Sequence, residues 1–121
     1  MSISKTILDK STWVHKNSKI EDPVHFSANV SLYGGSSVGK YSFFNVGTVI
    51  YPNVKIGRFC STGRWVEIGG AKHPTSYLST HLFQLGLSPF EEIKPSNKEK
   101  TTFNVHSTTT IGNDVWVGAK A

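Results

Sequence analysis

The sequence predicts an all-β fold in which short strands wind into a parallel solenoid. Three observations support this. An apolar residue recurs at every sixth position, a small or β-branched residue follows four places later, and residues that favour helices are scarce. An amphipathic helix would repeat its apolar residues every three or four positions, and a simple strand would alternate strictly. The six-residue period fits neither pattern, so each repeat is expected to form one strand and one corner of a stacked coil.

The apolar series runs from Leu8 to Ile68 and is interrupted only at Thr62. We expect it to fill the interior, with these inward residues: Ile20, Phe26, Leu32, Val38, Phe44, Ile50, Ile56 and Ile68. The second series runs from Thr12 to Lys72, which is its one exception, and is expected to point inward near the corners, where space is tight. Glycine follows the apolar series at four places, where we expect it to give the corners backbone freedom: Gly39, Gly57, Gly63 and Gly69.

Two features depend on this register. Cys60 belongs to the small inward series, which indicates a buried structural thiol rather than a reactive one. Tyr41, Phe59 and Trp65 stand one place before that series, on outward-facing positions. Exposed aromatic side chains there indicate either a contact surface between subunits or ordinary surface scatter.

The repeat stops at His73. Residues 74–104 carry no six-residue register, so we expect one projecting loop inserted into a single β-helix domain that spans residues 1–121. Long loops without periodicity in a compact domain usually carry function. The repeat resumes with Val105, Ile111 and Val117, one frame later, as expected for an insertion between coils.

Length and composition set further bounds. The 121 residues make one domain, and a net charge of +5 is compatible with plain solubility, or with a nucleic acid, a membrane surface or a phosphate-bearing ligand. Lysine and arginine are scattered, so we expect no nucleic-acid partner. A lone cysteine excludes an internal disulfide and a multi-cysteine zinc site. There is no long apolar stretch and no secretory signal pattern, so we expect no membrane span and a cytoplasmic location.

Two further segments carry a more specific signal: IGGAKHPTSYLST at residues 68–80 and TTIGNDVWVGAKA at residues 109–121. With the repeats, they make the chain from about residue 20 onward resemble the hexapeptide-repeat acyltransferases. The resemblance is greatest to the branch that holds type B chloramphenicol and streptogramin acetyltransferases and bacterial sugar O-acetyltransferases. It implies a left-handed parallel β-helix, against the usual right-handed crossover rule. It also implies a homotrimer with active sites between subunits.

The resemblance implies roles for individual residues. His73 matches the family's histidine before the projecting loop and would accept the proton of an acceptor hydroxyl, for which imidazole is well suited. Trp116, Gly118 and Ala119 match the segment that binds acetyl-coenzyme A. There Trp116 would shield the thioester, and the Ala119 N–H would donate to its oxygen.

A loop motif accompanies these residues. Ser79, Thr80 and Phe83 match the family's segment over the acceptor site, although Leu82 stands where that motif usually has proline. Asn113 and Asp114 are expected to shape a corner.

The function expected from these features is direct acetyl transfer from acetyl-coenzyme A to a carbohydrate hydroxyl, with no metal. A drug hydroxyl is the alternative acceptor, and a non-catalytic β-helix scaffold is the alternative role. A metal enzyme on the same fold needs histidines five apart, and no two here have that spacing: His15, His25, His73, His81 and His106. Relatives continue for several more coils, so we expect this chain to be a truncated form with weak or absent turnover.

Overall fold

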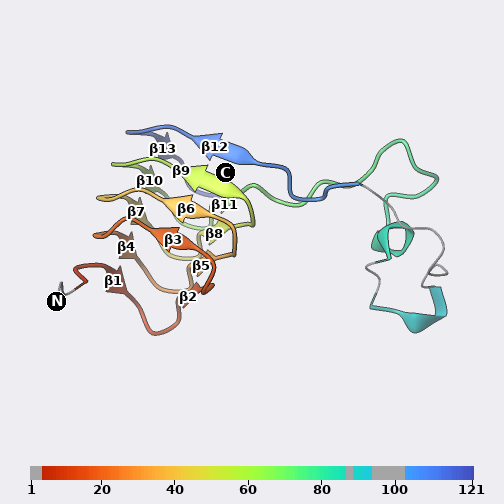
Figure 1. The fold of residues 1–121 in the computed structure, drawn as a ribbon, viewed down its shortest axis with the longest axis horizontal. Coiled ribbons are helices and arrows are strands. Elements are labelled where there is room, and N and C mark those ends of the chain that lie inside the picture. The colour runs from red at the N-terminus through yellow and green to blue at the C-terminus, as the bar shows by residue number, and fades with distance from the viewer. Residues whose placement is uncertain (1–3, 87–88, 94–102) are drawn as a thin grey trace. The chain divides into compact units, whose positions relative to one another are not determined.

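The chain turns a corner after nearly every strand and returns to the same wall one coil later (Figure 1). The computed structural model describes residues 4–86, 89–93 and 103–121. Their strands form three parallel sheets, which we name walls A, B and C. Wall A contains β1 (Ile7–Leu8), β4 (His25–Phe26), β7 (Phe43–Phe44), β10 (Ser61–Thr62) and β13 (Trp116–Val117). Wall B contains β2 (Trp13–Val14), β5 (Ser31–Leu32), β8 (Val49–Ile50) and β11 (Glu67–Ile68). Wall C contains β3 (Lys19–Ile20), β6 (Ser37–Val38), β9 (Val54–Ile56) and β12 (Thr109–Ile111).

The coils wind in a left-handed sense. In Figure 1 the near strands of wall C point to the left and the far strands of wall A point to the right, while the stack climbs from the N-terminus. Each strand pairs with the strand of the next coil, so that Phe26 lies opposite Phe44 and Phe44 opposite Thr62. The predicted parallel β-helix is therefore confirmed.

The core consists of the two predicted inward series. The large residues from Phe26 to Ile68 are buried as predicted, whereas Ile20 in the first coil is only half-buried. The small series is buried from Val24 to Val66, and it includes Cys60, which is 4% exposed. A six-residue period of burial thus accounts for the interior of the stack.

Serine and threonine occur in the small series because their hydroxyls join successive coils. Ser36 Oγ donates to the Tyr51 carbonyl at 2.7 Å and accepts from the Val54 N–H at 2.9 Å. Ser42 Oγ makes the same two bonds, to the Gly57 carbonyl at 3.0 Å and from the Cys60 N–H at 3.1 Å. A buried hydroxyl costs free energy only when it lacks a partner, so these positions accept a polar residue.

From Asn29 onward, one residue in each corner of the first unit has a left-handed backbone, with φ between 55° and 77°. This residue recurs at every sixth position: Asn29, Gly35, Tyr41, Gly47, Asn53, Phe59 and Trp65. Asp114 and Lys120 take the equivalent places after the loop. The prediction of corner glycines is confirmed for Gly69, which has φ 75°, but it is wrong for Gly39, Gly57 and Gly63, none of which has a left-handed φ.

Those glycines allow the backbones of successive coils to approach closely. A Cβ on Gly39 would lie 2.5 Å from the Gly57 carbonyl carbon. We expect Gly39→Ala to lower the free energy of unfolding by about 1–3 kcal/mol, because the rigid backbone opposite must move. Gly112→Ala is the matched control: it has no atom within 4 Å and should shift stability by less than about 1 kcal/mol. Equal urea midpoints for the two variants would contradict this explanation.

The described chain divides into two compact units, Met1–Gly70 with His106–Ala121 and Ala71–Val105, and we describe each by itself. The second unit contains two short 3₁₀ helices, η1 (Leu82–Leu85) and η2 (Glu91–Ile93). The predicted frame slip is confirmed, because Ile111 pairs with Ile56 and Val117 pairs with Thr62. The prediction that the repeat resumes at Val105 is wrong, because Val105 belongs to the second unit. Its carbonyl accepts the Lys72 N–H at 2.8 Å and so joins the two ends of the inserted segment.

Candidate functional site

His73 lies at the start of the second unit and is exposed. Its Nδ1 is 2.6 Å from the carbonyl oxygen of Thr80. A carbonyl can only accept, so Nδ1 must carry the hydrogen in this bond. In the neutral ring that leaves the Nε2 lone pair free, and the contact fixes the ring orientation. The side chain is thus prepared to accept a proton at Nε2.

The segment opposite His73 is ordered by local hydrogen bonds. Ser79 N–H donates to Gln84 Oε1 at 2.7 Å, and Ser79 Oγ accepts from the His81 N–H at 3.0 Å. Phe83 N–H donates to His81 Nδ1 at 3.0 Å, and the Phe83 ring lies against the same imidazole. The structure therefore brings Ser79, Thr80 and Phe83 together around one turn of chain. Sequence analysis missed Gln84, whose only signal is a polar residue in the apolar run HLFQL.

Trp116, Gly118 and Ala119 lie in the first unit, at the outer face of β13 and the corner that follows it. Trp116 is 75% exposed, and its indole leans over Gly118, where an added Cβ would be 3.6 Å away. Ala119 is exposed, and its N–H donates no hydrogen bond within the described residues, whereas the next N–H, of Lys120, donates to the Arg64 carbonyl at 2.8 Å. This corner offers an aromatic surface beside a free backbone donor, which fits a thioester carbonyl.

Asn113 and Asp114 shape the preceding corner, as expected. Asp114 has φ 55°, and Asn113 Oδ1 accepts the Arg58 N–H at 2.8 Å. Neither side chain belongs to the corner of Trp116 and Ala119, so both contribute to structure.

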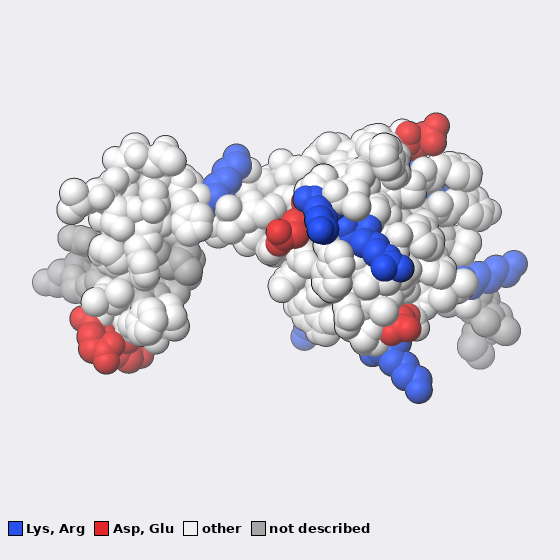
Figure 2. Space-filling model, turned by 180° about the vertical axis from the view of Figure 1, so that it is seen from behind, with Lys and Arg blue, Asp and Glu red and all other residues white. Residues whose placement is uncertain are grey.

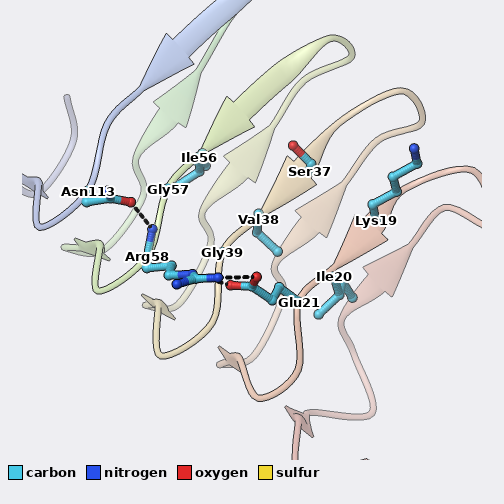
Figure 3. A pocket seen from close by; sticks show the side chains of 10 residues that line it. All are labelled: Lys19, Ile20, Glu21, Ser37, Val38, Gly39, Ile56, Gly57, Arg58 and Asn113. Carbon is cyan, nitrogen blue, oxygen red and sulfur yellow. Dashed lines mark hydrogen bonds and ion pairs between the residues drawn. The ribbon is translucent and has the colours of Figure 1, made fainter.

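A groove of about 410 Å³ crosses wall C (Figure 3). The Arg58 guanidinium spans it and binds Glu21 with two hydrogen bonds, Nε to Oε1 at 2.7 Å and Nη2 to Oε2 at 2.8 Å. Glu21 Oε1 also accepts the Lys40 N–H at 3.0 Å, so one carboxylate ties together three coils. Arg58 and Glu21 therefore neutralise each other within the groove, and Lys19, which also lines it, forms no ion pair among the described residues.

The Glu21 carboxylate gives this tie a pH dependence. Its pKa falls from 4.5 to about 2, chiefly because Arg58 donates to it. A depressed carboxylate pKa stabilises the fold above pH 4.5, and that contribution is lost as the pH falls from 4.5 toward 2. We expect Glu21→Gln to flatten the acid limb of a urea-midpoint titration in this window. Arg58→Met should flatten it less, because the Lys40 N–H still binds the carboxylate, and an unchanged acid limb in both variants would contradict the assignment.

Charge is distributed unevenly over the surface. On the face of the first unit shown in Figure 2, basic side chains stand in separate groups with acidic side chains between them. In the second unit acidic side chains gather at one place, where Glu91 and Glu92 begin η2. The face shown therefore presents no long basic track of the kind that follows a nucleic-acid backbone.

The described residues show neither a metal cluster nor a membrane-spanning helix. Within the described ranges, no three histidine, cysteine or acidic side chains come together as metal ligands. Over the same ranges, no helix has the length and apolar character needed to cross a bilayer. Comparison with protein-family models, curated proteins and solved structures gives no match for this chain.

Proposed function

We propose that the protein is an O-acetyltransferase that uses acetyl-coenzyme A and a carbohydrate hydroxyl. The observation that carries this proposal is the 2.6 Å contact from His73 Nδ1 to the Thr80 carbonyl, which leaves Nε2 as a proton acceptor. The motif resemblance around His73 and Trp116 supports the choice of acyl donor. It also supports a homotrimer with active sites between subunits.

The proposed chemistry is direct transfer. His73 Nε2 accepts the proton of the acceptor hydroxyl as that oxygen attacks the thioester carbonyl carbon. The Ala119 N–H donates to the oxyanion that develops. When the carbon–sulfur bond breaks, His73 returns the proton to the thiolate, which leaves the acetyl ester and a free thiol. The Trp116 indole covers the apolar part of the donor and limits the access of water.

The test measures thiol release from acetyl-coenzyme A by purified protein with two groups of acceptors. One group contains mono- and oligosaccharides, and the other contains drugs with a free hydroxyl. We expect turnover that is slow but measurable with at least one carbohydrate, and an O-acetylated product by mass spectrometry. Turnover with drugs alone would assign the alternative acceptor. If no acceptor supports thiol release and calorimetry shows no binding of coenzyme A, the proposal is overturned in favour of a scaffold.

A further inference from the structure

The groove on wall C lies between two rows of polar side chains (Figure 3). One row comes from the strands, with Lys19 on β3 and Ser37 on β6. The other row comes from the chain that follows the strands, with Arg58 after β9 and Asn113 after β12. The groove therefore receives polar groups from four successive coils.

Many hydrogen-bond donors of these side chains have no partner within the described residues. The Lys19 ammonium and the Ser37 hydroxyl make no hydrogen bond there. The Arg58 guanidinium uses Nε and Nη2 for Glu21, which leaves both hydrogens of Nη1. Asn113 Oδ1 accepts the Arg58 N–H, which leaves both hydrogens of Nδ2. The groove thus offers an ammonium, a hydroxyl, a guanidinium edge and an amide to a ligand.

Acceptors in the groove are few by comparison. Among the described residues that line it, Glu21 is the one carboxylate, and its oxygens already accept two hydrogen bonds from Arg58 and one from the Lys40 N–H. Lys19 and Arg58 together outweigh Glu21, so the lining has a net charge of +1. The hydroxyls of a neutral sugar need acceptors as well as donors. The groove is therefore better matched to a negatively charged group whose oxygens only accept.

The arrangement of the donors and the size of the groove indicate the kind of anion. The donors come from four coils, so they reach a bound group from different sides. A phosphate presents three acceptor oxygens in different directions, whereas a carboxylate presents two in one plane. The volume of about 410 Å³ is typical of small-molecule sites and exceeds what a phosphate ion alone needs. Gly39 and Gly57 place no side chain over the groove, which leaves room for the rest of an ester.

We propose that this groove binds a phosphate monoester of a small polar molecule. Lys19 holds the phosphate as a point charge on a flexible stem, and Ser37, Arg58 and Asn113 donate to its oxygens. The groove shares no residue with the corner of Trp116 and Ala119, so the site is separate from the proposed thioester site. The inference does not need the proposed acetyl transfer, since it rests on the donors, charge and size of the groove.

The test is a nuclear magnetic resonance titration of the isotope-labelled whole chain with glucose 6-phosphate. We expect saturable shifts of the Gly39 and Arg58 amide signals, with a dissociation constant of about 1 mM or below. Inorganic phosphate and glucuronate should each bind at least about fivefold more weakly, because one lacks the body of an ester and the other lacks a tetrahedral anion. Glucose should give no saturable shift.

Two variants should change this affinity in opposite directions. Lys19→Gln removes a charge that holds the phosphate and should weaken the binding of glucose 6-phosphate about tenfold. Glu21→Gln removes the carboxylate that competes for Arg58 and should strengthen binding several-fold. Lys10→Gln is the matched control, because it makes the same charge change at an exposed corner between β1 and β2. It should alter the affinity by less than about twofold.

Several outcomes would overturn the proposal. They are the absence of a saturable shift with glucose 6-phosphate, equally tight binding of inorganic phosphate or glucuronate, and wild-type affinity in Lys19→Gln. A folded Glu21→Gln variant that binds more weakly would also overturn it, and if that variant does not fold, Lys19→Gln against Lys10→Gln still decides. Competition by coenzyme A at the same amide signals would assign the groove to the acyl donor and overturn a separate site. An absence of acetyl transfer would bear on the proposed function alone.

Discussion

His73→Ala is expected to lower the rate of acetyl transfer by about a hundred- to ten-thousand-fold, the usual contribution of one general base. The variant keeps the Thr80 carbonyl but loses the imidazole that it orients, so no group remains to accept the acceptor proton at that place. Affinity for coenzyme A should change little, because the imidazole acts on the acceptor and not on the donor. Thiol-release kinetics give the rate, and calorimetry gives the affinity.

His81→Asn is the matched control for this substitution. His81 is a second exposed imidazole in the same segment, and asparagine can still accept the Phe83 N–H that now binds Nδ1. Turnover of this variant should stay within a few-fold of wild type. Near-normal turnover of His73→Ala would show that another group accepts the proton, and equal losses in both variants would indicate a structural effect of the loop.

Ile56→Asp is expected to abolish the folded state. Ile56 is 5% exposed and lies between Val38 and Ile111 on wall C, so the carboxylate would be buried without a partner. A buried unpaired charge costs about 4 kcal/mol or more, which is a large part of the stability of a domain of this size. Circular dichroism should show no cooperative thermal transition.

Lys55→Asp tests whether position or charge decides that outcome. Lys55 precedes Ile56 on the same strand but is exposed, so the same carboxylate would face water. This variant should fold with a midpoint close to wild type. Two folded variants, or two unfolded ones, would contradict the inward and outward register of β9.

The periodic part of the fold could be predicted because each repeat has the same neighbours. The inward position of Phe44 follows from its period alone, and so does the buried place of Cys60. The left-handed winding could not be derived from that period, because strand physics favours the opposite hand and only the resemblance indicated it. The role of Gly39 was also misread, since a sequence does not distinguish a glycine with a left-handed φ from one under a neighbouring backbone.

The candidate site was less accessible to sequence reasoning. Motif resemblance indicated His73 and Thr80, but not that the Thr80 carbonyl orients the imidazole, because a backbone contact has no sequence signature. The exposure of Tyr41, Phe59 and Trp65 could be predicted from the repeat, but the left-handed φ of each could not. Tyr41 and Asn53 occupy the same place in the repeat, and only the backbone shows that one of them is costly there.

The hydrogen bond that joins the two ends of the inserted segment bears on how such a protein can evolve. β12 pairs with β9 of the coil below and not with β11, which precedes it in the chain. The Lys72 N–H and the Val105 carbonyl close the segment between them at 2.8 Å. The length of what lies between is therefore not set by the register of the walls, and doubling a flexible loop costs only about 0.6 kcal/mol. Recombination or slippage could exchange this segment for another while the coils remain intact, so the sequence of the segment and the stability of the coils can evolve as separate traits.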